Sequence, residues 1–147
     1  MTTSPIVLLL NGPNLNMLGV REPEIYGTAT VEDHVAAFSD TLGPGVEVEH
    51  LESNHEGVLV DAIQAARGRC AAIVINGGAF THYSWAIHDA LATFDGPVVE
   101  VHISNPNARE PWRHTSVISP VATGTITGFG GHSYVLAALA VRQLLGG

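Results

Sequence analysis

The stretch IVLLLNGPN (residues 6–14) decides the fold, because five consecutive apolar residues run directly into an Asn-Gly-Pro-Asn turn. A short, uninterrupted apolar run bounded by turn residues is typical of a strand buried on both faces of a parallel sheet. Similar runs, each followed by a polar loop, recur along the chain. They predict five strands, over residues 6–10, 46–51, 71–75, 98–103 and 123–127.

Helical patterns between these runs predict four helices, over residues 31–42, 57–67, 85–94 and 133–145. In the second of them, Leu59, Ile63 and Ala66 fall on one face. Strands that alternate with helices form a parallel sheet covered on both faces. At this chain length we expect one α/β domain over residues 1–147, a flavodoxin-like three-layer sandwich with a five-stranded parallel sheet in the order 2-1-3-4-5.

The basic residues exclude several classes of function. Six Lys+Arg stand against 14 Asp+Glu, a net charge of −8, and all six basic residues are arginine. Without lysine there is neither a Schiff-base lysine nor a Walker A phosphate loop. Without a basic stripe, we expect no nucleic-acid partner.

The composition also bears on assembly and location. Charged residues make up 14% of the chain, against roughly 25% in an ordinary soluble domain, so we expect a homo-oligomer that buries part of an apolar surface. No apolar run reaches the roughly 20 residues of a membrane span. The single Cys70 cannot form an internal disulfide, and the N-terminus lacks the basic start of a signal peptide. These features predict a cytoplasmic protein without membrane contact.

Polar side chains collect where the predicted strands end. After the first, third and fourth strands come Asn11, Asn14, Asn76, His82, His102, Ser104, Asn105, Arg109 and Arg113. Ligands of parallel sheets bind outside the carboxyl ends of the strands. The sequence therefore predicts one site at this edge of the sheet.

The segment over residues 11–29 is much longer than the roughly 2–6 residues of a usual strand-to-helix loop. Gly19 and Gly27 lie near the ends of a stretch that carries Arg21 and Tyr26, which is consistent with a lid. A surface loop whose tyrosine packs on a neighbour fits equally well. A tyrosine has a reference pKa of about 10, so it acts as a base only where a cation stabilises the phenolate. Arg21 could supply that cation.

The end of the fourth strand offers an acid and anion-binding groups. Glu100 and His102 are two residues apart and share a strand face, so the carboxylate could orient the ring and favour a proton donor. A buried histidine satisfied by the backbone is the alternative. Ser104 suits a ligand carboxylate, together with Asn76 and backbone N–H groups. Arg109 and Arg113 lie four apart, on one face if that segment is helical, and could bind substrate or form ion pairs.

Other patterns favour structure over chemistry. None of the eight histidines falls in metal-ligand spacing with a third ligand nearby, so no metal is expected. The run GFGG (residues 128–131) indicates tight packing at a helix start rather than a dinucleotide loop. For Trp85 and Trp112, core or subunit-contact roles are expected.

Four blocks of sequence, which span nearly the whole chain, resemble the type II 3-dehydroquinate dehydratases. They are NGPNLNMLGVREPEIYG (11–27), ESNHEG (52–57), INGGAFTH (75–82) and EVHISN (100–105), the last followed by ARE (108–110). The resemblance implies a flavodoxin-like subunit that dehydrates 3-dehydroquinate to 3-dehydroshikimate by anti elimination through an enolate, without a cofactor. It also implies trimers gathered into dodecamers, in aromatic biosynthesis or in quinate breakdown.

Catalytic roles carried over by position start with Tyr26 as the base that removes the C2 proton and Arg21 as the arginine that makes it acidic enough. Asn14 matches the residue that holds a water against the enolate oxygen. His102, paired with Glu100, matches the acid that protonates the departing C1 hydroxyl.

Binding roles are implied in the same way. Ile103, through its backbone N–H, matches the carboxylate-binding set together with Asn76 and Ser104, and His82 and Arg113 match contacts to substrate hydroxyls. Arg109 matches an arginine of the lid region, and Asp89 matches a residue that reaches a neighbouring subunit's site.

The chain departs from the family pattern at Glu52, where Gln is usual, and at Gly77, Tyr83 and Pro111. None of these positions carries a proposed chemical role, but Glu52 adds negative charge near the site of an acidic substrate.

Two other functions are weighed against the lyase. A flavodoxin-like module for FMN or a phosphate ligand would need a Ser/Thr/Gly-rich loop after the first strand, and an inactive scaffold would have lost Tyr26, Arg21 or His102.

Overall fold

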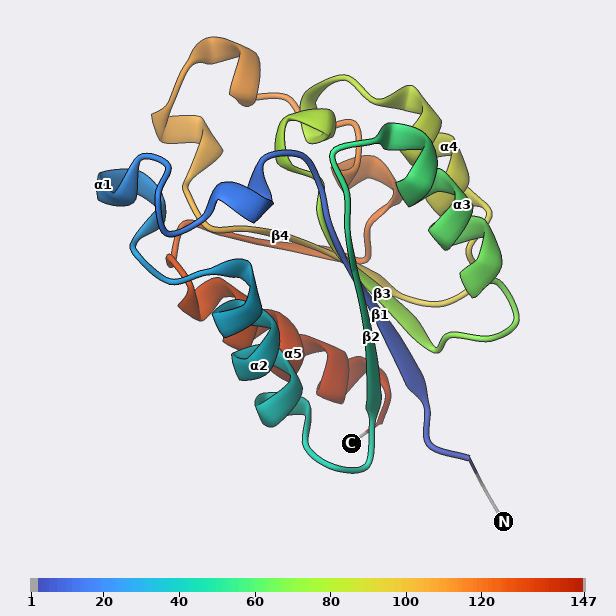
Figure 1. Cartoon of the computed structure of the whole chain (residues 1–147). Helices are drawn as coiled ribbons and strands as arrows, with labels where there is room; N and C mark the ends of the chain where they lie inside the picture. Colours follow the sequence, from blue (N-terminus) through green and yellow to red (C-terminus); the bar gives the residue numbers. More distant parts are fainter. Residues whose placement is uncertain (1–2, 147) are drawn as a thin grey trace.

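All five strands pair in parallel in the order β2-β1-β3-β4-β5 in the computed structural model, which describes residues 3–146 (Figure 1). The strands are β1 (Ile6–Asn11), β2 (Glu47–Glu52), β3 (Ala72–Asn76), β4 (Val98–His102) and β5 (Gly124–Thr127). Each begins and ends within one residue of its predicted range. The α/β class and the strand order predicted from the sequence are confirmed.

Four helices cover the two faces of the sheet (Figure 1). On one face α2 (Val31–Leu42) packs against α5 (His132–Leu144), and on the other α3 (Glu56–Ala66) packs against α4 (Trp85–Ala92). Helix α2 begins where it does because the Thr30 side chain accepts a hydrogen bond from the Asp33 backbone while the Asp33 carboxylate accepts one from the Thr30 backbone.

The central strands are buried on both sides, which explains their unbroken apolar runs. In β1, Val7 and Leu9 lie in the core beneath α2 and α5, while Leu8 and Leu10 lie in the core beneath α3 and α4. The alternation leaves Asn11, the last residue of β1, on the α2/α5 side, in register with Asn76 of β3. Two polar side chains thus end adjacent strands at one edge of the sheet.

The connection from β4 to β5 departs from the strict alternation of strands and helices. It contains three short 3-10 turns, at Pro106–Ala108, Pro111–Arg113 and Ser119–Val121, and no α-helix. The helix that would place Arg109 and Arg113 on one face does not form, because Pro111 lacks the backbone N–H that a continuing helix needs. The long segment after β1 likewise holds a 3-10 turn, Leu15–Met17, and the one-turn helix α1 (Pro23–Tyr26).

The expected tight packing at the start of α5 is confirmed at Gly131, where an added Cβ would lie 2.5 Å from the His34 ring. A core role for the two tryptophans is wrong: Trp85 is 61% exposed and Trp112 is 52% exposed. Both lie on short helical segments at the surface, outside the two apolar cores.

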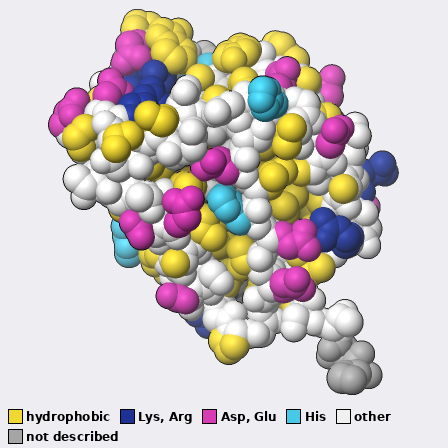
Figure 2. Space-filling view, in the orientation of Figure 1, with side chains coloured by type: hydrophobic (Ala, Val, Ile, Leu, Met, Phe, Trp, Pro, Cys, Tyr) yellow, Lys and Arg dark blue, Asp and Glu magenta, His cyan; other side chains and the backbone are white. Residues whose placement is uncertain are grey.

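Acidic side chains are scattered over the face of the molecule shown in Figure 2, whereas basic side chains occur in only a few places. Among residues 3–146 there is no helix with both the length and the apolar character to cross a bilayer.

Candidate active site

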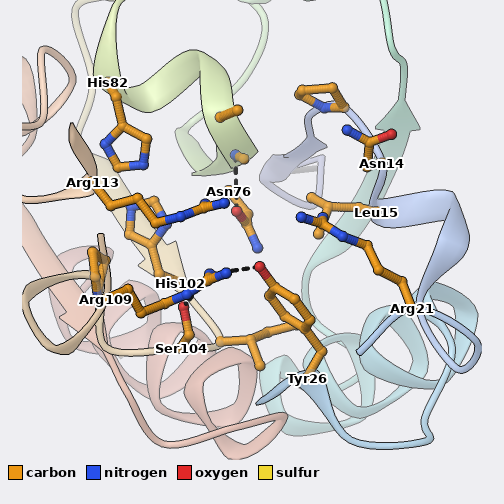
Figure 3. Close-up of a pocket in the computed structure, with 15 residues that line it drawn as sticks. Asn14, Leu15, Arg21, Tyr26, Asn76, His82, His102, Ser104, Arg109 and Arg113 are labelled. Atoms are coloured by element: carbon orange, nitrogen blue, oxygen red, sulfur yellow. Dashed lines mark hydrogen bonds between the residues drawn. The ribbon is translucent and has the colours of Figure 1, made fainter. Parts of the chain in front are cut away.

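A pocket lined by both polar and apolar side chains lies at the carboxyl edge of the sheet, where the sequence predicts a site (Figure 3). Three parts of the chain enclose it: the segment after β1, the turn after β3 and the segment after β4. Its lining residues are Pro13, Asn14, Leu15, Arg21, Tyr26, Asn76, Gly78, Ala79, His82, His102, Ile103, Ser104, Pro106, Arg109 and Arg113.

The Tyr26 hydroxyl points into the pocket and accepts a hydrogen bond of 2.6 Å from Nη1 of Arg109. Cζ of Arg21 lies 5.1 Å from the centre of the same ring, and Cζ of Arg109 lies 5.2 Å from it. Arg21 is therefore near the ring as expected, but the guanidinium on the phenol oxygen comes from Arg109, 83 residues away in sequence. Two guanidinium groups therefore flank one tyrosine ring.

Arg109 connects the segment after β1 to the end of β4. Its side chain is 11% exposed, its Nη1 also donates to Oγ of Ser104 at 3.3 Å, and its Nη2 lies 3.8 Å from the Glu22 carboxylate in the lid. Glu110 lies 3.8 Å from Nε, which is buried and has no hydrogen-bond partner among the described residues. The positive charge of Arg109 thus lies 3.8 Å from the carboxylates of Glu22 and Glu110, while its hydrogen bonds go to Tyr26 and Ser104.

The lid backbone turns at left-handed positions. Gly19 and Gly27, the two residues that the lid prediction takes as pivots, have φ of 95° and 79°, values that favour glycine. Asn14 also has a positive φ, 66°, and its backbone N–H donates to Oδ1 of Asn54 at 2.8 Å. This contact fixes the start of the lid so that the Asn14 side chain lines the pocket.

His102 and Glu100 form the predicted pair. Nε2 of His102 donates to Oε2 of Glu100 at 2.6 Å, and the carboxylate is 1% exposed. Ser116 and Ser119 donate to the same carboxylate at 2.9 and 2.5 Å. Burial alone would raise the pKa of Glu100, but the hydrogen bonds from His102, Ser119 and Ser116 together hold it below its ordinary value. Glu100 therefore stays anionic and keeps the proton on Nε2 of His102, whose ring lines the pocket.

His82 is held as a neutral hydrogen-bond acceptor. Its Nδ1 donates to the Thr115 carbonyl at 2.8 Å, which leaves Nε2 unprotonated when the ring is neutral. Burial lowers the pKa of His82, and the neighbouring charges of His102 and Arg113 lower it further. Beside it, Arg113 donates to Glu110 at 2.6 Å and stacks on the Trp112 ring at 4.0 Å. The exposed Trp112 thus serves as a platform for a site arginine.

Asn76 presents an N–H group at the centre of the pocket. The residue is 3% exposed, its Oδ1 accepts from the Gly78 backbone at 3.1 Å, and its Nδ2 donates to the Tyr134 hydroxyl at 3.0 Å. One amide hydrogen of Nδ2 remains to meet a ligand. Ile103 and Ser104, which follow β4 directly, also line the pocket.

Three of the six arginines line this one pocket, in a chain whose net charge is −8. Such a concentration of guanidinium groups favours an anionic ligand, since each can donate charge-assisted hydrogen bonds to a carboxylate. Within residues 3–146 no group of three or more His, Cys, Asp or Glu side chains is placed to hold a metal ion.

Residues 5–142 match the family model described as dehydroquinase class II. The chain belongs to this family. It is 54% identical over 142 residues to 3-dehydroquinate dehydratase 2 of Pseudomonas putida, covering 96% of this chain and 95% of that one. It is also 54% identical over 134 residues to the catabolic 3-dehydroquinase of Aspergillus clavatus, covering 89% and 88%. The crystal structure of type II dehydroquinase from Butyrivibrio crossotus superposes with a TM-score of 0.89 at 46% identity, covering 95% of this chain and 97% of that one.

The dehydroquinase family consists of hydro-lyases, so the chain is an enzyme of that kind. Membership supports the lyase interpretation over the two alternatives, a module for FMN or a phosphate ligand and an inactive scaffold. The pocket gathers most of the residues assigned from the sequence; Glu100 lies behind His102. Asp89 lies outside it, on α4, where its side chain is 82% exposed and pairs with His88 at 3.1 Å.

Several dehydroquinase residues that support the site escape sequence reasoning. Asn54 is part of a recognised block, yet nothing local indicates that it binds the backbone of Asn14. Ser116 and Ser119 lie in a loop without a motif, and their contact with Glu100 depends on the path of the chain after β4. Tyr134 lies in an apolar helix, where a tyrosine is ordinarily a core residue.

Proposed function

We propose that this dehydroquinase converts 3-dehydroquinate to 3-dehydroshikimate by anti elimination of water through an enolate. Tyr26, as the phenolate, takes the C2 proton, and the electron pair of that C–H bond passes to the ketone oxygen. When the enolate collapses, the C1–O bond breaks and His102 donates the proton that lets the hydroxyl leave as water. One proton then returns from Tyr26 to His102 through solvent, which restores both groups.

One observation carries this proposal: the Tyr26 hydroxyl, bonded to Arg109, and the His102 ring, bonded to Glu100, line the same pocket. An anti elimination needs a base and an acid on opposite sides of the bond that becomes double. Here the base is on the lid and the acid is on β4, so a substrate between them meets both. Each group has the partner its role requires, a cation for a phenolate and a carboxylate for an imidazolium.

The other lining residues suit the substrate's remaining groups. A carboxylate fits the amide N–H of Asn76, the Ser104 hydroxyl and the backbone N–H of Ile103, and the ring hydroxyls fit His82 and Arg113. The side chain of Asn14 is placed to hold a water against the enolate oxygen. Arg21 and Arg109 stabilise negative charge on the base. No cofactor is needed, because the ketone itself accepts the electron pair.

We further propose that the whole chain forms a single dehydroquinase domain and that trimers of it assemble into a cytoplasmic dodecamer. The low charge content and the exposed Trp85 support a subunit contact. The exposed Asp89 supports its reaching a neighbouring subunit's site. Relatives with a catabolic name and relatives without one match equally well, so both aromatic biosynthesis and quinate breakdown are compatible with the site.

The test is the appearance of the conjugated enone, followed by ultraviolet absorbance after adding 3-dehydroquinate. Tyr26→Phe is expected to lose most of kcat while substrate binding survives, because the change removes the base and little else. Tyr83→Phe, at an exposed tyrosine, is the matched control and should retain activity. Near-normal turnover by Tyr26→Phe would show that another group removes the proton.

A further inference from the structure

A chain of four hydrogen bonds runs from the edge strand β2 to the centre of the pocket. The Gly78 backbone donates to Oδ1 of Asn76 at 3.1 Å, and Nδ2 of Asn76 donates to the Tyr134 hydroxyl at 3.0 Å. The Tyr134 hydroxyl donates to Oδ1 of Asn11 at 2.6 Å, and Nδ2 of Asn11 donates to Nε2 of His50 at 3.0 Å. We refer to Asn76, Tyr134, Asn11 and His50 as the relay.

The direction of every bond in the relay follows from its first member. A backbone N–H can only donate, so the oxygen of Asn76 must face Gly78 and its nitrogen must face Tyr134. The Tyr134 oxygen accepts from that nitrogen and gives its only proton to Asn11, whose own nitrogen is then left to donate to His50. Each member therefore has one orientation in which all four bonds are made.

The relay is rigid because its middle is inaccessible to water. Asn11 and Tyr134 are fully buried, and the Tyr134 ring stacks on His34 with centroids 5.1 Å apart and planes 7° from parallel. Burial strongly raises the pKa of Tyr134, so its hydroxyl stays protonated as the direction of the relay requires. At the outer end, partial burial lowers the pKa of His50, which favours the neutral ring that can accept from Asn11.

We propose that Tyr134 is a positioning residue for substrate binding: through the relay it keeps the nitrogen of Asn76, rather than the oxygen, directed at the substrate carboxylate. This inference rests on the proposed function, in which Asn76 binds that carboxylate. The two ends of a primary amide differ little in shape, so Asn76 could rotate if only Gly78 held it. A rotated amide would place a lone pair against the carboxylate where a donor is needed. The relay disfavours the rotated amide of Asn76, and it requires that the polar groups of Asn11, Asn76 and Tyr134 be buried beside the core.

The experiment is a double-mutant cycle between Tyr134→Phe and Asn76→Ala, with KM and kcat measured for 3-dehydroquinate. Tyr134→Phe keeps the ring that stacks on His34 and removes only the hydroxyl. Loss of the donor orientation should raise KM by roughly tenfold, the effect of about one hydrogen bond, with kcat within about threefold of the parent. In the Asn76→Ala background the same change should have no further effect on KM, because no amide is left to orient.

Two results would overturn the inference: an unchanged KM in Tyr134→Phe, or the same rise in KM with and without the Asn76 side chain. The second would mean that the hydroxyl acts on the fold in general. Tyr83→Phe serves as the control for the substitution, and thermal unfolding checks that each variant is folded. If Tyr134→Phe does not fold, His50→Leu at the partly exposed end of the relay takes its place in the cycle, with the same dependence on Asn76 expected. Failure of the proposed function would show separately, as absence of turnover in the parent enzyme.

Discussion

Replacing Arg109 with methionine tests whether the guanidinium on the Tyr26 oxygen activates the base. Methionine keeps much of the apolar length of the side chain and removes the charge and the hydrogen bond of 2.6 Å. The same substitution leaves Arg21 beside the ring, so the variant separates the contact with the oxygen from the contact with the ring face. Arg142→Met, on the exposed surface of α5, is the matched control.

The expected size follows from the chemistry of that contact. A hydrogen bond to a charged group contributes about 1.5–3 kcal/mol, and this one is largely shielded, since the Arg109 side chain is 11% exposed. At about 1.4 kcal/mol for each factor of ten, its loss should lower kcat by roughly 10- to 100-fold. Phenolate stabilisation acts on the proton-transfer step, so KM should change much less.

Enone formation from 3-dehydroquinate gives both constants, and thermal unfolding verifies that the variant is folded. Arg109 also bonds Ser104, so a small rise in KM is compatible with the reasoning. A kcat within about threefold of the parent would refute the activation of Tyr26 by Arg109. A rise in KM at constant kcat would instead make Arg109 a binding residue.

Three further changes have defined outcomes. Glu100→Gln should lower kcat strongly with little loss of stability, because it removes the carboxylate that accepts the hydrogen bond from Nε2 of His102 while nearly keeping the shape of the side chain; equal kcat in the two proteins would exclude a role for that charge. Glu52→Gln should raise the free energy of unfolding, measured by thermal unfolding, by less than about 1 kcal/mol at neutral pH and leave it unchanged at about pH 4. The reason is that burial and then Glu32 raise the pKa of this partly exposed carboxyl, one oxygen of which has no hydrogen-bond partner among residues 3–146. A lower free energy of unfolding at neutral pH would contradict it. The free energy of unfolding should fall as the pH drops below about 6.5. Three histidines have lowered pKa values in the folded chain, so the unfolded chain binds more protons below that pH; they are His34, His50 and His82. An unfolding midpoint that does not change between pH 7.5 and 5.5 would contradict this.

The fold could be predicted from the sequence because its signals are local. An apolar run such as that of β1 can be buried only between two layers, and the turn residues after it mark the edge where polar groups meet. The segment between β4 and β5 was harder, because three prolines at the starts of short turns leave no helical period to detect. The expected core role for the two tryptophans, one of the two roles predicted, was wrong because a large apolar side chain indicates burial only on average.

The site was predictable as a set of residues but not as a set of contacts. Glu100 and His102 are two residues apart on one strand, so their pairing follows from strand geometry alone. The partner of Tyr26 does not follow in this way. Arg21 is near in sequence and lies over the ring, whereas the oxygen is bonded by Arg109, whose position depends on the whole sheet between them. A contact between residues 83 positions apart, such as that of Arg109 with Tyr26, cannot be predicted from the spacing of neighbouring residues.

Tyr26 and Arg109 belong to different parts of the chain, the segment after β1 and the segment after β4. Tyr26 is carried by a segment with glycine pivots at Gly19 and Gly27, whereas Arg109 follows β4 and is tied to Ser104. Displacement of this segment would separate the phenol from Arg109 and break the hydrogen bond of 2.6 Å. In the proposed mechanism, Tyr26 therefore has its contact with Arg109 only when the segment after β1 covers the pocket. Because this contact joins two separate segments of the chain, the proposed mechanism couples the position of the segment after β1 to the activation of the base.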